Sequence, residues 1–364
     1  MKGISVYPNK SSVADCINYI DKAADLGFSR LFTSLLELTE DQSKTLNKFK
    51  TVLTHARARK MWVSLDVNPA LFASLHVSYN DLSFFKELGA DIVRLDSSFD
   101  GLPESVMTYN PEGLTIEVNI SNDTKNLENI LSYSPIKDKI IGCNNFYPQR
   151  YTGLDTEYFL NTTKKYHDLG LRTAAFISSN SGKIGPHPYN AGLPTLEIHR
   201  GIPIEKQAQY LINTQLIDDI LIGNAFASDE ELQKVAKLSS NIPQFFIDFV
   251  PTATELEREI VLKNLHFNRG DINSYAIRST FVKLKYNKQN IPVNNPVPTL
   301  KRGMITIGNN DFKQYKGELN IVKQNMDNHD HLKNVVAQIV PSDLQYIDFI
   351  KPWDKFKFIE LASY

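Results

Sequence analysis

The stretch IIGCNNFYPQRYTGL, residues 140–154, changes within a few positions from an apolar run to amides, tyrosines, an arginine and a glycine turn. Residues 140–143 are small or β-branched, which is typical of a strand covered on both faces. The side chains that follow, among them Asn145, Tyr147 and Arg150, cost free energy when they are buried without partners. Ligands bind at such polar strand ends in open α/β sheets and (β/α) barrels. The stretch therefore predicts a buried strand that ends in a chemical site; the alternative is a polar loop with a satisfied asparagine pair.

The same pattern recurs along the first two thirds of the chain, where short apolar segments alternate with helical patterns. The expected helices include Thr39–Lys60, Thr156–Leu169 and Ser228–Leu238, the last with Ser228 as N-cap and Glu231 at the capping-box position. The expected strands are Ile4–Tyr7, Arg30–Leu36, Trp62–Asn68, Ile92–Asp96, Leu114–Asn119, the strand that begins at Ile140, Arg172–Ser178 and Asp219–Ala225. Eight strands alternating with helices in about 240 residues are the count and length of an α/β protein with a (β/α)8 barrel.

The pattern of the sequence changes after Asn241, where the alternation of strands and helices gives way to short β-like segments. Short β-like segments, Tyr346–Ile350 among them, are separated by Pro, Asn, Asp and Gly, with one helical pattern at Thr252–Leu262. This pattern predicts a second, mainly antiparallel domain that forms a small barrel. The expected domains are residues 1–241 and 242–364.

The bulk composition narrows the function classes. The chain has 364 residues, of which 42% are hydrophobic and 22% charged, as in soluble globular proteins. A formal net charge of −1 and the lack of long Lys/Arg blocks argue against a nucleic-acid or membrane-surface partner. No run approaches about 18 apolar residues, so no membrane span is expected.

The only cysteines, Cys16 and Cys143, make no disulfide framework and have no His-rich spacing around them that would indicate a zinc site. The N-terminal residues show no signal-peptide pattern. We therefore expect a reducing, cytoplasmic compartment.

In a barrel, the carboxyl ends of the strands converge at one mouth. The residues that the pattern brings there are Asp66, Asn68, Asp96, Glu117, Asn119, Asn145, Tyr147, Ser178 and Asn224. This set has three carboxylates and no lysine for a Schiff base, and the histidines fall in helix or loop contexts rather than at strand ends. The sequence thus predicts a site without metal or organic cofactor.

Asp96 and Glu117 fall on neighbouring strands, whose spacing of about 4.8 Å suits the carboxylate pair of a glycoside hydrolase. One carboxyl of such a pair, with a raised pKa, protonates the leaving oxygen, and the other stabilises or captures the oxocarbenium-like centre. Asp66 is the expected third member or an acceptor for a substrate hydroxyl. The alternative is that these acids bind loop amides or pair with Arg94.

Several cations indicate an anionic ligand. Arg150 follows the sixth strand, and Lys183 lies among serines and glycine after the seventh, in the barrel sector where phosphate sites recur. Arg269 and Arg278 lie in the second domain. The alternative for each is a solvated charge.

Eight stretches spread over the chain resemble the two-domain 6-phospho-N-acetylmuramidases, glycoside hydrolase family 170. They are GISVYP at 3–8, GFSRLFTSLL at 27–36, ELGADIVRLD at 87–96, IGCNNFYPQRYTGL at 141–154, GLPTLEIHR at 192–200, DDILIGNAFASDEEL at 218–231, RGDINSYAIRST at 269–280 and IGNNDFKQYKGEL at 307–319. The resemblance implies a barrel followed by a cyclophilin-like β domain, with the substrate between them. It also implies cytoplasmic hydrolysis of N-acetylmuramic acid 6-phosphate–N-acetylglucosamine during the recovery of bacterial cell-wall fragments.

The resulting hypothesis gives Asp96 and Glu117 the acid/base and stabilising roles, with Asp66 in support. The expected sugar-positioning residues are Asn119, Asn145, Tyr147 and Asn224, and the expected anion-binding residues are Arg150, Arg269 and Arg278. Two routes stay open, in which either the 2-acetamido group or a protein carboxylate attacks the anomeric carbon. The rival hypothesis is a non-catalytic protein that binds a sugar or a peptide.

Overall fold

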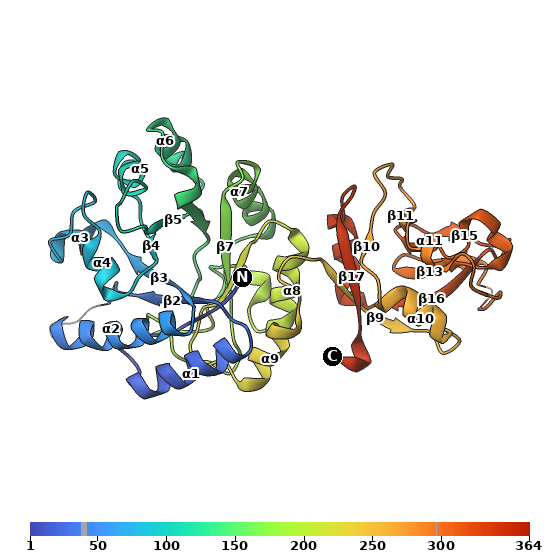
Figure 1. Ribbon diagram of the computed structural model, residues 1–364, viewed down its shortest axis with the longest axis horizontal. Helices are drawn as coiled ribbons and strands as arrows, with labels where there is room; N and C mark the ends of the chain where they lie inside the picture. The colour runs from blue at the N-terminus through green and yellow to red at the C-terminus, as the bar shows by residue number, and fades with distance from the viewer. Residues whose placement is uncertain (38–41, 296) are drawn as a thin grey trace. The chain divides into compact units, whose positions relative to one another are not determined.

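The computed structural model describes residues 1–37, 42–295 and 297–364 (Figure 1). The chain divides into two compact units, one made of Met1–Leu211 and Leu216–Ser240, the other of Ile212–Gln215 and Asn241–Tyr364. Each unit is built around its own sheet.

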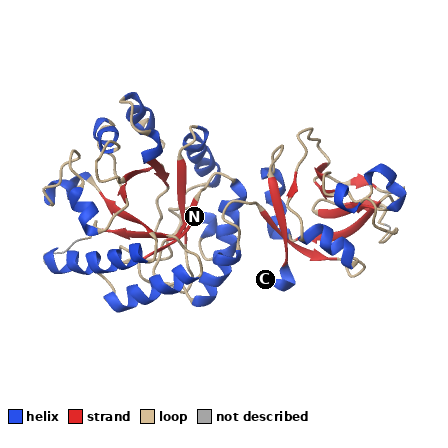
Figure 2. Cartoon of the chain, in the orientation of Figure 1, coloured by secondary structure: helices blue, strands red, loops and turns tan. Residues whose placement is uncertain are grey.

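The first unit contains a closed barrel of eight parallel strands that pair in chain order, with β8 returning to β1 (Figure 2). The strands are β1 (Lys2–Ser5), β2 (Arg30–Ser34), β3 (Trp62–Val67), β4 (Ile92–Leu95), β5 (Thr115–Asn119), β6 (Ile140–Cys143), β7 (Arg172–Ile177) and β8 (Asp219–Ile222). Nearly every strand residue is buried, as the apolar runs of the sequence indicated. The predicted (β/α)8 barrel is confirmed.

Helices follow the strands and lie outside the barrel (Figure 1). They are α1 (Val13–Asp25), α2 (Gln42–Ala58), α3 (Pro69–Ser74), α4 (Ser83–Leu88), α5 (Leu102–Met107), α6 (Asn126–Ser132), α7 (Thr156–Asp168), α8 (Ile204–Thr214) and α9 (Asp229–Lys237). The capping box predicted at Ser228 and Glu231 is present at the start of α9. Of the helix expected over Thr39–Lys60, residues 39–41 lie outside the described residues. In residues 1–37, 42–295 and 297–364, no helix combines the length and the apolarity needed to cross a membrane.

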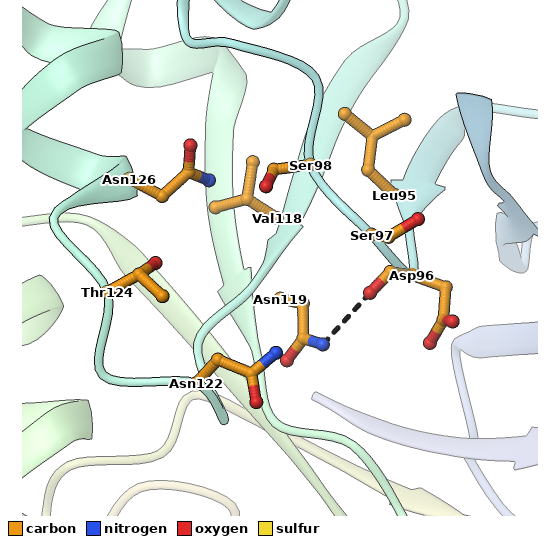
Figure 3. Close-up of a pocket in the computed structure, with 9 residues that line it drawn as sticks. All are labelled: Leu95, Asp96, Ser97, Ser98, Val118, Asn119, Asn122, Thr124 and Asn126. Atoms are coloured by element: carbon orange, nitrogen blue, oxygen red, sulfur yellow. Dashed lines mark hydrogen bonds between the residues drawn. The ribbon is translucent and has the colours of Figure 1, made fainter.

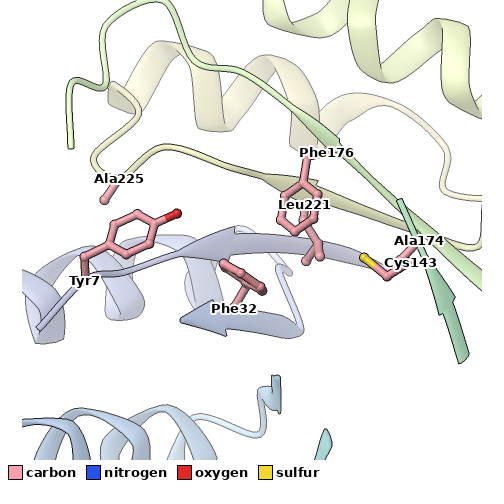
Figure 4. Packing of buried hydrophobic residues seen from close by; sticks show 7 residues of the cluster. All are labelled: Tyr7, Phe32, Cys143, Ala174, Phe176, Leu221 and Ala225. Atoms are coloured by element: carbon pink, nitrogen blue, oxygen red, sulfur yellow. The ribbon is translucent and has the colours of Figure 1, made fainter. Parts of the chain in front are cut away.

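Aromatic side chains fill part of the barrel interior (Figure 4). A buried cluster contains Tyr7, Phe32, Cys143, Ala174, Phe176, Leu221 and Ala225. The rings of Phe32 and Phe176 meet edge to face with centroids 5.1 Å apart, an arrangement that aromatic pairs prefer. This cluster makes the barrel a packed core, so a ligand can approach only at the strand ends.

The second unit is organised around a seven-stranded sheet in the order β10-β17-β9-β16-β13-β14-β11. These strands are β9 (Gln244–Phe249), β10 (His266–Phe267), β11 (Ala276–Ser279), β13 (Met304–Gly308), β14 (Leu319–Val322), β16 (Lys333–Ile339) and β17 (Lys355–Glu360). The two edges of the sheet approach each other, since the backbone N–H of Arg269 donates to the carbonyl of Arg278 over 3.2 Å. The sheet is therefore a nearly closed barrel. A small second sheet pairs β12 (Thr299–Leu300) with β15 (Met326–Asp327), and the helices are α10 (Glu255–Leu262) and α11 (Lys283–Tyr286).

The prediction of a mainly antiparallel sheet is confirmed for the described strands, with one exception that makes the sheet mixed: β17 pairs in parallel with β9 after the chain has traversed most of the unit. Local patterns carry no signal for the direction of so distant a pairing. One expectation needs correction. The strand expected at Tyr346–Ile350 is instead part of a 3₁₀ segment, Pro341–Phe349. Pro341 favours such a start, and the buried Asp343 carboxylate anchors the segment by accepting from the N–H of Phe246 over 2.9 Å.

Candidate active site

Strand register determines which polar side chains meet inside the barrel. Asp66 on β3 lies beside Arg94 on β4, and Arg94 lies beside Glu117 on β5. Asp96 and Asn119 come two positions after Arg94 and Glu117, and side chains two residues apart share a face of a strand. Asp96 and Asn119 therefore lie one step nearer the mouth than Arg94 and Glu117.

Arg94 connects the polar groups at the mouth. Its Nη1 atom donates to Asp66 Oδ1 and lies 3.5 Å from Asp96 Oδ1, while its Nη2 atom donates to Asn145 Oδ1. The side chain is buried. Burial by itself lowers the pKa of the Arg94 guanidinium, but the charges of Asp66 and Asp96 raise that pKa overall. Arg94 is thus a fixed cation that holds two carboxylates and an amide.

Asp66 has the electrostatic properties of a proton donor. Only 3% of its surface is exposed, and burial raises the pKa of its carboxyl to about 6 against the opposing effect of Arg94. Ser34 Oγ donates to Asp66 Oδ2 over 3.1 Å and the neighbouring Asp96 raises the pKa further. A carboxyl with this pKa keeps a useful protonated fraction near neutral pH.

Asp96 is the accessible partner of Asp66, with 39% of its side chain exposed. Because the two carboxylates contact the same nitrogen of Arg94, their oxygens lie no more than about 6 Å apart, a span that includes the separation of carboxylate pairs in retaining glycosidases. We call Asp66, Arg94 and Asp96 the mouth cluster. Together they offer one buried acid with a raised pKa beside one accessible acid.

Glu117 is not brought to the mouth. It is fully buried and pairs with Arg30, which also pairs with Asp219 at the start of β8. Arg172 donates to the same Asp219 through Nε over 2.8 Å. We call Arg30, Glu117, Arg172 and Asp219 the base cluster. Glu117 Oε1 makes no hydrogen bond within the described residues and faces Arg94 Nε at 3.7 Å, so Glu117 links the two clusters.

The predicted sugar-binding amides have different surroundings. Asn145 accepts from Arg94 through Oδ1, whereas its Nδ2 group makes no hydrogen bond to any part of the chain that the structure describes. Asn119 uses both ends of its amide, donating to the carbonyl of Asp96 over 2.9 Å and accepting from the N–H of Ser121 over 2.9 Å. Asn145 therefore keeps a donor for a ligand, while Asn119 fixes the backbone at Asp96.

Tyr147 lies three residues after Asn144 on the loop that leaves β6, and it is half-buried. Burial raises the pKa of its phenol, and Ser121 lowers it by hydrogen bonding. The Asp96 charge acts on the same phenol. Tyr147 thus offers a neutral hydroxyl group that lies close enough to the mouth cluster for the charge of Asp96 to affect its pKa.

Two hollows open near these residues. The smaller, about 100 Å³, is lined by Leu95, Asp96, Ser97, Ser98, Val118, Asn119, Asn122, Thr124 and Asn126. Figure 3 shows the Asp96 carboxylate directed away from the other residues of this hollow, toward which only the backbone of Asp96 turns. This hollow of about 100 Å³ is small for a sugar, since ligand cavities usually measure about 300–1,000 Å³.

The larger hollow, about 670 Å³, lies on the loops after β6 and β7 and has Arg150 in its lining. Asn224 lies beneath this region, almost fully buried. Its Nδ2 donates to the carbonyls of Ser179 and Gly182, and its Oδ1 accepts from the N–H of Ser179 over 2.8 Å. These bonds engage the whole amide, so Asn224 supports the loop after β7.

The two predicted cations of the second unit are both in ion pairs. Arg269 pairs with Asp271, two residues along the chain, and Arg278 on β11 pairs with Glu318 at 2.9 Å. Arg278 is half-buried and Arg269 lies at a partly exposed turn. Arg150, by contrast, has no ion pair with any residue in the described ranges 1–37, 42–295 and 297–364.

Sequence reasoning missed several residues that organise the site. Arg94 entered only as an alternative partner for the acids, although its position two residues before Asp96 placed it on the same strand face. Ser34 ends β2 and satisfies the strand-end rule that found Asp66. Arg30 gave no such signal, because an arginine at the start of an apolar strand is more often solvated. No three His, Cys, Asp or Glu side chains among the described residues are arranged to hold a metal ion.

Comparison with known proteins gives matches over nearly the whole chain. A family model described as 6-phospho-N-acetylmuramidase, N-terminal, matches residues 2–237, and one described as 6-phospho-N-acetylmuramidase, C-terminal, matches residues 243–359. No curated protein matches the chain.

Among solved structures, an uncharacterized protein of B. cereus is 47% identical to this chain, with a TM-score of 0.85 and 99% of each chain covered. A conserved protein of unknown function from Enterococcus faecalis is 24% identical, with a TM-score of 0.64, and the match covers 100% of this chain and 97% of that one. The second likeness concerns the fold alone.

Proposed function

This chain belongs to the 6-phospho-N-acetylmuramidase family, which makes it a glycosidase, and from that premise we propose that it hydrolyses N-acetylmuramic acid 6-phosphate–N-acetylglucosamine. The proposal places this reaction in the cytoplasm, in the recovery of bacterial cell-wall fragments. The observation that carries it is the sharing of one guanidinium nitrogen of Arg94 by a buried and an accessible carboxylate.

We assign the catalytic roles to Asp66 and Asp96. Asp66, whose pKa is raised to about 6, gives its proton to the glycosidic oxygen as the bond to the anomeric carbon breaks. The Asp96 carboxylate, which lies 3.5 Å from Arg94 Nη1, stabilises the positive charge that develops on the sugar. Water then supplies the hydroxyl at the anomeric carbon, and its proton returns to Asp66.

Two forms of the second step are compatible with this arrangement. In one, the oxygen of the substrate's 2-acetamido group attacks the anomeric carbon while Asp96 holds the amide N–H. In the other, an Asp96 oxygen forms the bond itself. The free Nδ2 donor of Asn145 and the Tyr147 hydroxyl bind sugar oxygens in both forms, and Asn119 keeps Asp96 in place.

Glu117 has a different role in this proposal. Its burial between Arg30 and the Nε edge of Arg94 supports a positioning role, in which it fixes the guanidinium that carries both catalytic acids. Asn224 likewise supports the loop after β7 rather than touching the sugar.

The proposal also gives the second unit a role in substrate binding. We propose that it takes part in substrate binding through Arg269 or Arg278, each of which exchanges its present carboxylate partner for an anionic group of the substrate. We also propose that its fold is cyclophilin-like, which is supported by the mixed, nearly closed seven-stranded sheet.

The test is hydrolysis of the 6-phosphorylated disaccharide beside its unphosphorylated twin, followed by proton NMR of the newly formed sugar. We expect N-acetylglucosamine to be released from the phosphorylated compound in preference. Retention at the anomeric carbon fits either route above, whereas inversion requires direct attack by water. A folded protein that leaves both disaccharides intact contradicts the proposed function.

A further inference from the structure

The hollow of about 670 Å³ on the barrel has the size of a ligand site. The loops after β6 and β7 form it, and its lining residues are Arg150, Tyr151, Ser178, Ser179, Asn180, Gly182, Lys183, Asn190, Ala191, Gly192, Glu197, Arg200 and Gly201. All of them belong to the first unit. The loops that follow the last strands are where many barrels bind phosphate.

The cations that line this hollow differ in whether a carboxylate pairs with them. Arg200 and Glu197 neutralise each other, with Arg200 Nε and Nη2 each 2.7 Å from a Glu197 oxygen. The other two cations, Arg150 and Lys183, are exposed, and neither has a carboxylate partner among residues 1–37, 42–295 and 297–364. Lys183 Nζ donates only to the carbonyl of Asn180, over 2.7 Å. The hollow therefore carries two cations that are in no ion pair within the described residues, while the Glu231 carboxylate is bound below it by Ser179 Oγ and the N–H of Asn180.

The floor of the hollow is held rigidly from below. Ser178 Oγ accepts from the N–H of Leu193 over 2.9 Å, and Ser179 Oγ accepts from the N–H of Gly182 over 2.7 Å and donates to Glu231 over 2.6 Å. A Cβ atom on Gly182 would lie 2.8 Å from the carbonyl oxygen of Ala225, so only glycine fits there. The loop that presents Lys183 is thus fixed before a ligand arrives, which lowers the entropic cost of binding.

The same structural elements connect this hollow with the mouth cluster. Arg200 Nη2 donates to the carbonyl of Tyr147 over 3.0 Å, and Thr195 Oγ1 donates to the carbonyl of Asn145 over 2.8 Å. Asn145 in turn accepts from Arg94. One short segment, residues 145–150, therefore carries a mouth residue at one end and a cation of the hollow at the other.

We propose that this hollow binds the phosphate monoester of the substrate, with Arg150 and Lys183 pairing with its oxygens. A phosphate monoester is a dianion near neutral pH and matches two such cations, whereas a carboxylate matches one. The inference rests on the proposed function, because it takes the phosphorylated sugar as the ligand. It selects Arg150 as the phosphate ligand in preference to Arg269 and Arg278, which are paired with carboxylates.

The experiment measures binding apart from turnover. Inorganic phosphate, N-acetylglucosamine 6-phosphate and N-acetylmuramic acid are titrated separately into the full-length protein and into the R150Q, K183Q and double variants. The matched control is K137Q, which removes one exposed charge just before β6, at the opposite end of that strand from Arg150. Because a charge-assisted contact contributes about 1.5–3 kcal/mol, each single variant is expected to weaken binding of the two phosphate compounds roughly 10- to 100-fold.

The controls are expected to separate phosphate from carboxylate. K137Q keeps the wild-type affinities, and R150Q and K183Q keep the affinity for N-acetylmuramic acid, which has the lactyl carboxylate but no phosphate. Unchanged phosphate affinity in the double variant overturns the proposal. Loss of affinity for N-acetylmuramic acid with unchanged phosphate affinity also overturns it, because the hollow would then bind the carboxylate.

Hydrolysis of the phosphorylated disaccharide is measured in parallel, so that this proposal and the proposed function fail separately. Turnover by the wild type with unchanged KM in R150Q and K183Q leaves the function standing and refutes the phosphate site. Phosphate binding that depends on both residues, without turnover of either disaccharide, supports the phosphate site and refutes the function.

Discussion

The mouth cluster and the base cluster use the same chemical groups, carboxylates around buried guanidinium groups, with opposite results. At the base, two arginines contact Asp219 and lower the pKa of its carboxyl to about 2, although burial opposes them. At the mouth, one arginine serves both Asp66 and Asp96, and burial raises the pKa of Asp66 to about 6. The ratio of cations to carboxylates, rather than burial alone, thus separates a carboxyl with a lowered pKa from one with a raised pKa.

This comparison gives the two ends of one barrel different tasks. A carboxylate saturated with guanidinium groups fixes strands to one another, and breaking such a buried set leaves a charge without a partner. A carboxylate that shares its cation with a second carboxylate can have a pKa in the range that acid–base catalysis uses. The predictions below test whether activity depends on the mouth cluster and stability on the base cluster.

The largest effect is expected for D66N and D96N. Each change removes a catalytic carboxyl while keeping its shape, so kcat should fall about 10²- to 10⁴-fold, the usual contribution of general acid–base catalysis. Steady-state hydrolysis of the phosphorylated disaccharide measures the loss, and circular dichroism checks that each variant is folded. Turnover within tenfold of the wild type in either folded variant would remove that residue from the mechanism.

The matching change at the base, E117Q, is expected to act on stability first. It leaves Arg30 with one carboxylate fewer in a fully buried setting, and breaking such a pair costs about 3–5 kcal/mol. Urea unfolding followed by fluorescence gives the free energy of unfolding. An unchanged free energy of unfolding in E117Q would contradict the stabilising role assigned to Glu117 and end the distinction between the clusters.

The pH dependence of kcat sharpens the comparison. Because Asp66 must be protonated to act as the acid, kcat should be constant below a pH of about 6 and fall tenfold per unit above it. Initial rates between pH 5 and 9, at saturating substrate in buffers of constant ionic strength, would measure this limb. A profile that is flat to pH 8 would show that Asp66 is not the proton donor.

Stability should respond to pH in opposite directions at the two clusters. The raised pKa of Asp66 favours the folded state below the ordinary Asp pKa, near 4, and this contribution is lost as the pH rises through about 6. The lowered pKa of Asp219 stabilises the protein above the ordinary value and this contribution is lost as the pH falls toward about 2. Thermal unfolding of D66N against the wild type, from pH 4 to 7, should show a difference that grows with pH in favour of the variant. A constant difference would contradict the assigned pKa direction.

The smallest effect is expected for S34A. Ser34 donates one hydrogen bond of 3.1 Å to Asp66 and lowers its pKa, so its loss should move the pH limb of kcat upward by less than about one unit. S64A is the matched control, because Ser64 also lies buried on β3 but its hydroxyl has no hydrogen-bond partner among the described residues. A shift to lower pH in S34A alone would reverse the sign assigned to this bond.

The amino-acid pattern was sufficient to predict much of this molecule. Alternation of apolar runs with capped helices predicted the barrel, and the strand-end rule selected Asp66 and Asp96 together with Glu117, which the structure places deeper in the barrel. The resemblance to a family named the activity class, which the family models support. These features are local or periodic, so they can be recognised from the amino-acid sequence alone.

Three-dimensional packing decided the rest. Asp96 lies just beyond the end of β4 whereas Glu117 lies inside β5, and the stagger of neighbouring strands in a closed barrel is a global property that no single strand pattern records. The central position of Arg94 also depends on packing, because three elements bring Asp66, Asp96 and Asn145 to its guanidinium group. The sequence by itself thus selected Asp66, Asp96 and Glu117 as strand-end acids; the tertiary structure decided which of them reach the mouth and which has a raised pKa, because both properties depend on neighbours from other strands.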